Sequence, residues 1–277
     1  MKWIPALSPL PRLDVARVTL RGRAHDLPYL HRPGPGPAVL FIHGLGGAKE
    51  NFYWAMQSPA LARCELLTFD QPGTGQARFR PEDDLDVSAL AELTHALAER
   101  LISRPYILAG ASMGGLITLL QMRRHGTDGI RGYVNIEGNL LAEDCMFSRR
   151  AIPHSLDEFT ERVFAEGIHE LRRSTRAGDR IIAHNMALNV DARAYYTYSL
   201  ETVKESDSGV LLEEFLALRM PKLFLYGDAN RHLSYLPRLR ATDVRVVEVP
   251  DSGHFVFYDN PVAMYGAIGA FVDEVGE

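Results

Sequence analysis

Short apolar runs rich in β-branched residues alternate along the chain with longer segments whose apolar positions recur at helical spacing. The short runs predict eight strands, at residues 15–20, 27–31, 39–43, 65–70, 106–111, 132–137, 222–226 and 244–249. The longer segments predict helices at residues 52–62, 87–103, 113–125, 233–240 and 261–275. Strands that alternate with helices indicate an α/β fold with a mostly parallel sheet. The first two strands follow each other without a helix, so we expect them to be antiparallel.

The alternation stops once, between the sixth and seventh predicted strands. The segment between them instead predicts helices at residues 156–173, 179–189, 192–204 and 211–218. Because it begins and ends at strand termini, we interpret it as an insertion. We therefore expect a core domain formed by residues 1–138 and 219–277, with residues 139–218 as an inserted helical cap.

Composition changes this picture little but excludes several classes of protein. The chain has 277 residues, of which 46% are hydrophobic and 23% charged, as in an ordinary globular protein. Its net charge of −5 argues against a nucleic-acid partner. Residues 1–13 lack the apolar core of a signal peptide, and the apolar stretch at 107–120 is too short for a membrane span. We expect a cytoplasmic protein that has no membrane partner, and the sequence leaves a homo-oligomer open.

No cofactor or metal site is indicated. The two cysteines, Cys64 and Cys145, match neither a disulfide framework nor a zinc spacing. No His-Glu-x-x-His motif occurs. The glycine-rich stretch after the third predicted strand lacks the spacing and the acidic residue of a dinucleotide site.

The sequence Gly110-Ala111-Ser112-Met113-Gly114 follows a predicted strand and precedes a predicted helix. Strand, Gly-x-Ser-x-Gly and helix form the context of a nucleophile elbow, a sharp turn that projects the serine hydroxyl at the sheet edge. The glycines supply the lack of bulk that this turn needs, and the helix N-terminus favours developing negative charge. Ser112 is therefore the candidate nucleophile.

A second glycine-rich turn, His43-Gly44-Leu45-Gly46-Gly47, follows the third predicted strand. A loop in this position can present a backbone N–H to an oxyanion, so we predict the N–H groups of Leu45 and Met113 as the two donors. We expect His43 to brace this loop rather than to act as a base.

These motifs resemble those of the α/β-hydrolase fold superfamily, from about residue 15 to the end of the chain. Three further fragments carry the resemblance: residues 70–75 (Asp-Gln-Pro-Gly-Thr-Gly), the pair Gly227-Asp228, and residues 251–255 (Asp-Ser-Gly-His-Phe). The resemblance implies a loop after the last strand that carries the catalytic base, which is His254 here. We interpret the turn at residues 70–75 as structural, although Ala77 stands where the family often has serine.

The acid of the implied triad has two candidates. The family often has Gly-x-x-Asp after its seventh strand, but here Asn230 occupies that position and Asp228 lies two residues earlier. Some branches, including certain haloalkane dehalogenases, place the acid after strand six, where this chain has Glu137. We favour Glu137 and keep Asp228 as the second choice. Those dehalogenases use an elbow aspartate where this chain has Ser112, so dehalogenation is disfavoured.

The resemblance implies a carboxylester hydrolase-like enzyme that cleaves an ester or related acyl bond of a small molecule through an acyl-enzyme. Ser112, His254 and Glu137 would form its triad. Two alternatives stay open. The same fold supports perhydrolases, carbon–carbon bond hydrolases and lyases, and it also supports non-catalytic ligand receptors.

Overall fold

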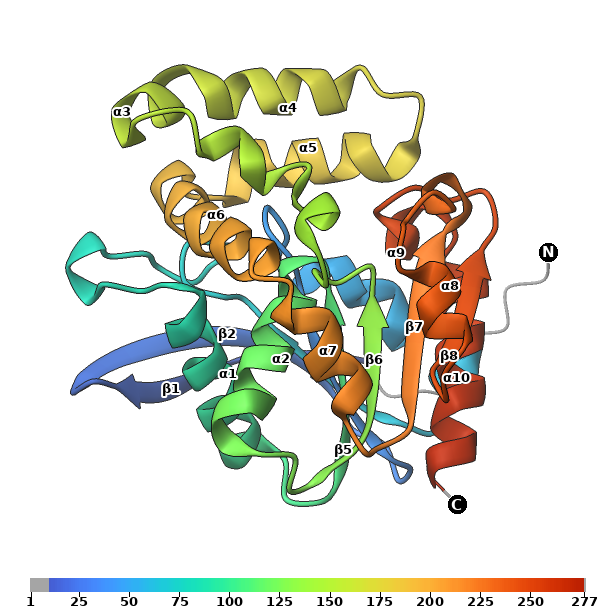
Figure 1. Cartoon of the computed structure of the whole chain (residues 1–277). Coiled ribbons are helices and arrows are strands. Elements are labelled where there is room, and N and C mark those ends of the chain that lie inside the picture. The colour runs from blue at the N-terminus through green and yellow to red at the C-terminus, as the bar shows by residue number, and fades with distance from the viewer. Residues whose placement is uncertain (1–9, 277) are drawn as a thin grey trace.

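Eight strands pair side by side in the computed structural model, which describes residues 10–276 (Figure 1). Their spatial order is β1-β2-β4-β3-β5-β6-β7-β8. In chain order they are β1 (Arg12–Leu20), β2 (Arg23–Arg32), β3 (Ala38–Ile42), β4 (Glu65–Phe69), β5 (Tyr106–Ala111), β6 (Ile130–Ile136), β7 (Lys222–Gly227) and β8 (Arg245–Val249). Strand β2 is antiparallel to both β1 and β4, and the other neighbouring pairs are parallel. The predicted mostly parallel sheet and its antiparallel beginning are confirmed.

Helices flank the sheet on both sides. Those that lie outside the segment between β6 and β7 are α1 (Val87–Leu101), α2 (Met113–His125), α8 (Leu236–Arg240), α9 (Val256–Asp259) and α10 (Pro261–Gly276). The segment between β6 and β7 contains α3 (Leu156–Glu158), α4 (Phe164–Arg172), α5 (Ala177–Asn189), α6 (Ala192–Asp207) and α7 (Val210–Ala217). Shorter 3-10 turns are η1 (Lys49–Gln57), η2 (Pro59–Leu61), η3 (Pro81–Asp83), η4 (Ala142–Cys145), η5 (Ser148–Ala151) and η7 (Asp228–Asn230).

The predicted helix at residues 52–62 is wrong. The chain there forms η1 and η2, separated at Ser58, which has extended backbone angles. Pro59 has no N–H to donate, so a regular helix cannot continue through it. The segment predicted as one helix at 156–173 is also irregular, because a π turn, η6 (Phe159–Val163), joins α3 to α4.

The central strands are buried on both faces, and their side chains alternate between two apolar clusters. Leu40 and Ile42 of β3 pack in the cluster that includes α1 and α2, whereas Val39 and Phe41 pack in the cluster that includes η1 and α10. A strand covered on both faces has a continuous apolar sequence, as β3 does. The carboxyl ends of the parallel strands thus share one edge of a rigid sheet.

The segment between β6 and β7 lies over that edge, with α4 and α5 outermost and α6 beneath them (Figure 1). Its last helix, α7, packs down beside α2. There the ring of Phe215 lies 5.7 Å from that of Tyr133 and 6.4 Å from that of Phe224. The division into a core domain and a cap at residues 139–218 stays a prediction, and residues 1–9 and 277 of that core lie outside the described part.

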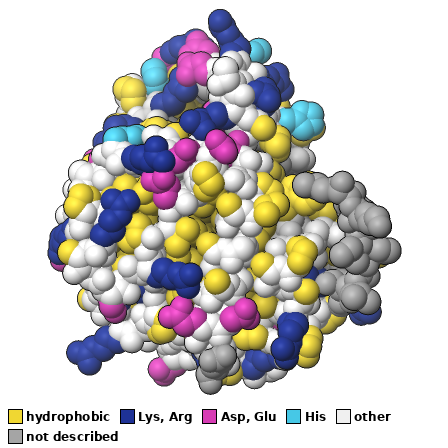
Figure 2. Space-filling model, turned by 90° about the vertical axis from the view of Figure 1, so that its right-hand side faces the viewer, with side chains coloured by type: hydrophobic (Ala, Val, Ile, Leu, Met, Phe, Trp, Pro, Cys, Tyr) yellow, Lys and Arg dark blue, Asp and Glu magenta, His cyan; other side chains and the backbone are white. Residues whose placement is uncertain are grey.

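The surface over α8 and α10 carries basic and acidic side chains that are interspersed rather than segregated by sign (Figure 2). Two ion pairs involve the neighbouring β8: Glu248 pairs at 2.5 Å with Arg231, which follows η7, and Arg245 pairs at 3.0 Å with Glu274 of α10. Within residues 10–276, none of the helices has both the length and the apolar character that a bilayer crossing requires. The predicted cellular compartment stays a prediction.

Candidate active site

Ser112 lies in the turn between β5 and α2, with φ 53° and ψ −126°. Such a backbone costs a non-glycine residue about 1–3 kcal/mol and is found mainly at functional sites. The turn is possible because the residues two positions before and after Ser112 are glycines. A Cβ on Gly110 would strike the carbonyl oxygen of Gly114, and one on Gly114 would strike that of Ile42. The local geometry is that of the predicted elbow.

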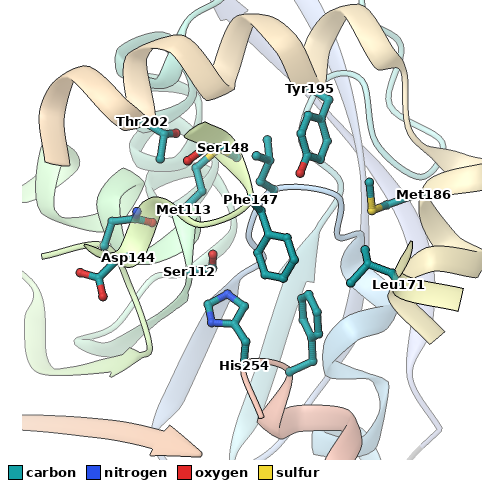
Figure 3. Close-up of a pocket in the computed structure, with 13 residues that line it drawn as sticks. Ser112, Met113, Asp144, Phe147, Ser148, Leu171, Met186, Tyr195, Thr202 and His254 are labelled. Carbon is teal, nitrogen blue, oxygen red and sulfur yellow. The ribbon is translucent and has the colours of Figure 1, made fainter. Parts of the chain in front are cut away.

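Ser112 and His254 face one cavity, which we call the Ser112 cavity (Figure 3). Its volume is about 20 Å³, enough for roughly one water-sized group. The other residues that line it are Leu45, Met113, Asn139, Asp144, Phe147, Ser148, Leu171, Met186, Tyr195, Thr202 and Phe255. Asp144, Ser148 and Thr202 lie on one side of it, whereas Leu171 and Met186 lie on the other (Figure 3).

Glu137 directly follows β6 and holds the His254 ring. Its Oε2 lies 2.7 Å from Nδ1 of His254. The same carboxylate accepts hydrogen bonds from the Gly227 N–H, at 2.6 Å on Oε1, and from the Asn230 Nδ2, at 2.7 Å on Oε2. The Glu137 side chain is only 4% exposed, and its φ of 44° is a second strained backbone in the site.

The electrostatics of His254 follow from this contact. Burial by itself lowers the pKa of the imidazole, but the hydrogen bond and the charge of Glu137 outweigh it, so the pKa of His254 is raised. Because Nδ1 faces a carboxylate, the neutral ring carries its proton on Nδ1 and leaves the Nε2 lone pair free to accept a proton.

Asp228, the second candidate for the acid, contacts a different group. Its Oδ1 accepts a hydrogen bond from the Ser252 N–H at 3.0 Å, and this bond lowers the pKa of the Asp228 carboxyl. It therefore orders the loop that leads to His254, without a hydrogen bond to the imidazole. Asn230 occupies the position where the family often has its acid, and its amide donates to Glu137. No local sequence signal identifies that contact.

The Leu45 and Met113 N–H groups, predicted as the oxyanion donors, lie beside the elbow and have no hydrogen-bond partner in the described part of the chain. Gly44 lies against the elbow, because a Cβ there would approach that of Ser112 to 2.7 Å. Neither the Leu45 nor the Met113 N–H donates a hydrogen bond to any group within residues 10–276. Both residues line the Ser112 cavity, so two unpaired donors are available beside the serine.

His43 braces the loop that carries Leu45. Its Nδ1 lies 2.9 Å from the Gly44 carbonyl oxygen, and its Nε2 accepts a hydrogen bond from the Gln71 N–H at 3.2 Å. Complete burial lowers the pKa of the imidazole, so the ring is neutral. The bracing role predicted for His43 is confirmed.

The turn after β4 is tied to η1 through Asp70. The Asp70 carboxylate accepts from the Lys49 N–H at 2.9 Å, from the Lys49 Nζ at 2.8 Å and from the Gln76 N–H at 2.8 Å. A fully buried carboxylate is stable only with such partners. For Asp70, the structural interpretation of this turn agrees with the contacts.

A second cavity continues from the first into the inserted segment, and we call it the Gly167 cavity. The two cavities share Phe147, Leu171, Met186 and Tyr195. The remaining residues of the Gly167 cavity are Arg150, Phe159, Val163, Phe164 and Gly167. Its only charged lining residue, Arg150, is paired with Glu170 through its two terminal guanidinium nitrogens, Nη1 at 2.8 Å and Nη2 at 2.7 Å. The path that leads away from Ser112 is therefore apolar.

Asp144 is a further carboxylate of the Ser112 cavity, and it is not among the residues predicted from the sequence. Burial raises its pKa to about 6, although the Leu140 and Leu141 N–H groups and the Tyr235 hydroxyl all donate to it. These contacts show that it caps η4. The described residues contain no group of three or more His, Cys, Asp or Glu side chains that could hold a metal ion.

Comparisons with known proteins agree with the fold. The family model described as "Alpha/beta hydrolase family" matches residues 39–267. The thermophilic esterase from Thermogutta terrifontis has a similar structure, with a TM-score of 0.77 at 20% identity over 96% of this chain and 100% of the other.

Two curated relatives are similar in sequence over most of the chain. One is the 2-succinyl-6-hydroxy-2,4-cyclohexadiene-1-carboxylate synthase of Yersinia pseudotuberculosis, 23% identical over 86% of this chain and 88% of that protein. The other is the sn-1-specific diacylglycerol lipase ABHD11 of Danio rerio, 24% identical over 86% and 79%. Because their names describe different reactions, they support a common fold and leave the substrate open.

Proposed function

The chain belongs to the alpha/beta hydrolase family and is an enzyme of that fold. From that premise we propose that it is a serine hydrolase that cleaves a carboxylic ester through an acyl-enzyme. Ser112 is the nucleophile, His254 the general base and acid, and Glu137 the residue that orients and stabilises the imidazolium. The observation that carries the proposal is the 2.7 Å contact between Glu137 Oε2 and His254 Nδ1. His254 and Ser112 line the same cavity.

The reaction begins when Ser112 Oγ attacks the carbonyl carbon of the ester and His254 Nε2 takes the hydroxyl proton. The carbonyl oxygen becomes an oxyanion, which the Leu45 and Met113 N–H groups bind. Preorganised donors of this kind each contribute about 2.7–4 kcal/mol to the transition state. The intermediate then expels the alkoxide, which leaves as the alcohol with the proton from His254. Water then attacks the carbonyl carbon of the acyl-enzyme while His254 takes its proton. His254 returns the proton to Ser112 Oγ as the carboxylic acid leaves.

The apolar Gly167 cavity supports an ester whose acyl group is a hydrocarbon chain or an aromatic ring. Each methylene buried there is worth about 0.8 kcal/mol, or roughly a fourfold gain in kcat/KM. A charged acyl group has no free partner along this path, because Glu170 already neutralises Arg150.

A panel of p-nitrophenyl esters from acetate to octanoate tests both the activity and the acyl site. We expect turnover of these esters, with kcat/KM rising as the acyl chain lengthens. In Gly167→Leu, the added side chain fills the Gly167 cavity, so the ratio of octanoate to acetate kcat/KM should fall by about tenfold or more. The substitution is sterically mild for the helix, since the one heavy atom within 4 Å of a Cβ at Gly167 is Arg150 Nη1, at 3.7 Å.

Gly167→Ala is the matched control, because one methyl group leaves most of the cavity open and its effect should be smaller. An unchanged ratio in Gly167→Leu would mean that the acyl chain lies elsewhere. A folded wild-type protein that turns over none of the esters would refute the proposed activity itself.

The pH dependence of kcat/KM should report the state of His254, which must be neutral to take the proton from Ser112. Because Glu137 raises the pKa of His254, activity should be lost as the pH falls through a value above the ordinary histidine pKa of 6.5. The pH profile of kcat/KM for a p-nitrophenyl ester measures this. Half-maximal activity below pH 6.5 would contradict the Glu137–His254 pairing.

A further inference from the structure

Gln71 is a buried side chain whose carboxamide has no hydrogen-bond partner among residues 10–276. The residue is 1% exposed, and both its Oε1 and its Nε2 are unpaired. Burial of an amide without hydrogen-bond partners costs free energy of folding, and nearly all buried polar atoms in proteins have a partner. Gln71 belongs to the turn at residues 70–75, and the contacts of Asp70 account for this turn without Gln71.

The backbone holds Gln71 in place. Its N–H donates to His43 Nε2 at 3.2 Å, and its carbonyl oxygen accepts from the Thr74 N–H at 2.9 Å and the Thr74 hydroxyl at 2.8 Å. The bond to His43 joins Gln71 to the loop that presents Leu45, and the bonds from Thr74 close the turn that contains Gln71. The carboxamide is thus carried on a rigid support next to the proposed oxyanion donors.

Gln71 lines a third cavity, which we call the Gln71 cavity. It shares Leu45, Met113 and Tyr195 with the Ser112 cavity, so it adjoins the site on the side of the two N–H donors. Its other lining residues are Gly46, Gly73, Thr74, Val190, Ala194 and Tyr198. The hydroxyls of Thr74 and Tyr198 already donate to backbone carbonyls. The Leu45 and Met113 N–H groups, which only donate, and the Tyr195 hydroxyl also have no hydrogen-bond partner among residues 10–276. Of the groups that line this cavity, the Gln71 carboxamide is the buried side chain in which a donor and an acceptor are both unpaired.

We propose that the Gln71 cavity is a polar subsite that takes a neutral hydroxyl group of the substrate, with Nε2 donating a hydrogen bond to the hydroxyl oxygen and Oε1 accepting a hydrogen bond from the hydroxyl. This inference rests on the proposed ester hydrolysis and names a feature of its substrate. A carboxamide both donates and accepts, so it matches a group that does the same. None of the lining residues is charged, which disfavours a carboxylate or an ammonium group. The cavity volume of about 10 Å³ admits roughly one water-sized group.

The test compares esters that differ by one hydroxyl. Ethyl 2-hydroxybutyrate and ethyl 3-hydroxybutyrate are compared with ethyl butyrate, and 2-hydroxyethyl butyrate with propyl butyrate, so that the acyl and alcohol sides are both sampled. In the wild-type protein, we expect at least one hydroxylated ester to exceed its partner in kcat/KM by about tenfold. In Gln71→Leu and Gln71→Met, that ratio should fall to about one.

The control is Gln121→Leu in α2. Gln121 is likewise 1% exposed and has an unpaired Oε1, but it lines none of the three cavities. In this variant, the ratio of kcat/KM between each hydroxylated ester and its partner should equal that of the wild-type protein.

Thermal unfolding of the Gln71 variants supplies a second readout. Because the Gln71 carboxamide is unpaired, replacing it with an apolar side chain should leave the melting temperature unchanged or raise it.

Three results would overturn the subsite: a ratio near one in every wild-type pair, an unchanged ratio in both Gln71 variants, or a melting temperature lowered by several degrees in both. The last would mean that the carboxamide is satisfied in the folded protein, as by a buried water molecule. Wild-type turnover of ethyl butyrate tests the proposed function separately, so failure of the subsite is distinguishable from failure of the esterase activity.

Discussion

Replacing Ser112 with alanine should lower kcat for ester hydrolysis by a factor on the order of 10⁶, the loss seen when a triad serine is removed. The alanine has no oxygen to form the acyl-enzyme, although the Leu45 and Met113 N–H groups and the substrate cavities stay in place. The measurement is steady-state hydrolysis of a p-nitrophenyl ester by highly purified protein.

The same substitution should leave the fold intact, because alanine and serine experience similar strain at φ 53°. We expect melting temperatures within about 2 °C of each other. Ser112→Gly is a useful companion, since glycine adopts positive φ without strain and also lacks the hydroxyl. Retained activity in these two folded variants would place the nucleophile elsewhere.

The second large effect is expected for Glu137→Gln. An amide cannot stabilise the imidazolium as a carboxylate does, and its NH₂ group presents a donor where His254 Nδ1 and the Gly227 N–H need acceptors. The corresponding change in a serine protease triad costs about 10⁴ in kcat. We therefore expect a loss of about 10⁴, measured on the same ester.

Asp228→Asn is the matched control for that loss. The asparagine oxygen can still accept the Ser252 N–H, and the Asp228 carboxylate has no hydrogen bond to His254 in the described residues. Activity should stay within about threefold of wild type, as for a substitution outside the triad. If Asp228→Asn loses activity and Glu137→Gln keeps it, the acid is wrongly assigned.

Local patterns predicted the elbow well. The apolar run of β5, the glycines around Ser112 and the apolar periodicity of α2 are all contiguous in sequence, and both predicted ranges equal the observed elements. The same local patterns do not predict the 3-10 turn η1. Its backbone departs from helical geometry at Phe52, where φ is −104° and ψ is 17°.

The partner of His254 depends on contacts between distant segments, which no local pattern contains. Glu137 is separated from His254 by 117 residues, and its orientation depends on donors from Gly227 and Asn230 in the loop after β7. The sequence could therefore supply two candidate carboxylates but not the geometry that separates them.

The lining of the cavities was less predictable still. Phe147 lies between two short 3-10 turns, where periodicity carries no information about which face is inward. Gln71 occupies a turn position at which a polar residue is ordinary, and only its burial together with its two unpaired amide atoms distinguishes it. Such residues are identified in the structure, by finding which buried polar atoms have no hydrogen-bond partner.

The central claim is that Ser112 is an activated nucleophile, and covalent labelling with a fluorophosphonate tests it most directly. The reagent loses fluoride and forms a bond from phosphorus to the oxygen of an activated serine. Mass spectrometry of the intact protein and of its peptides should find one phosphonyl group, on Ser112, and no adduct on Ser112→Ala at the same reagent concentration. An unlabelled wild-type protein, or equal labelling of Ser112→Ala, would contradict the account.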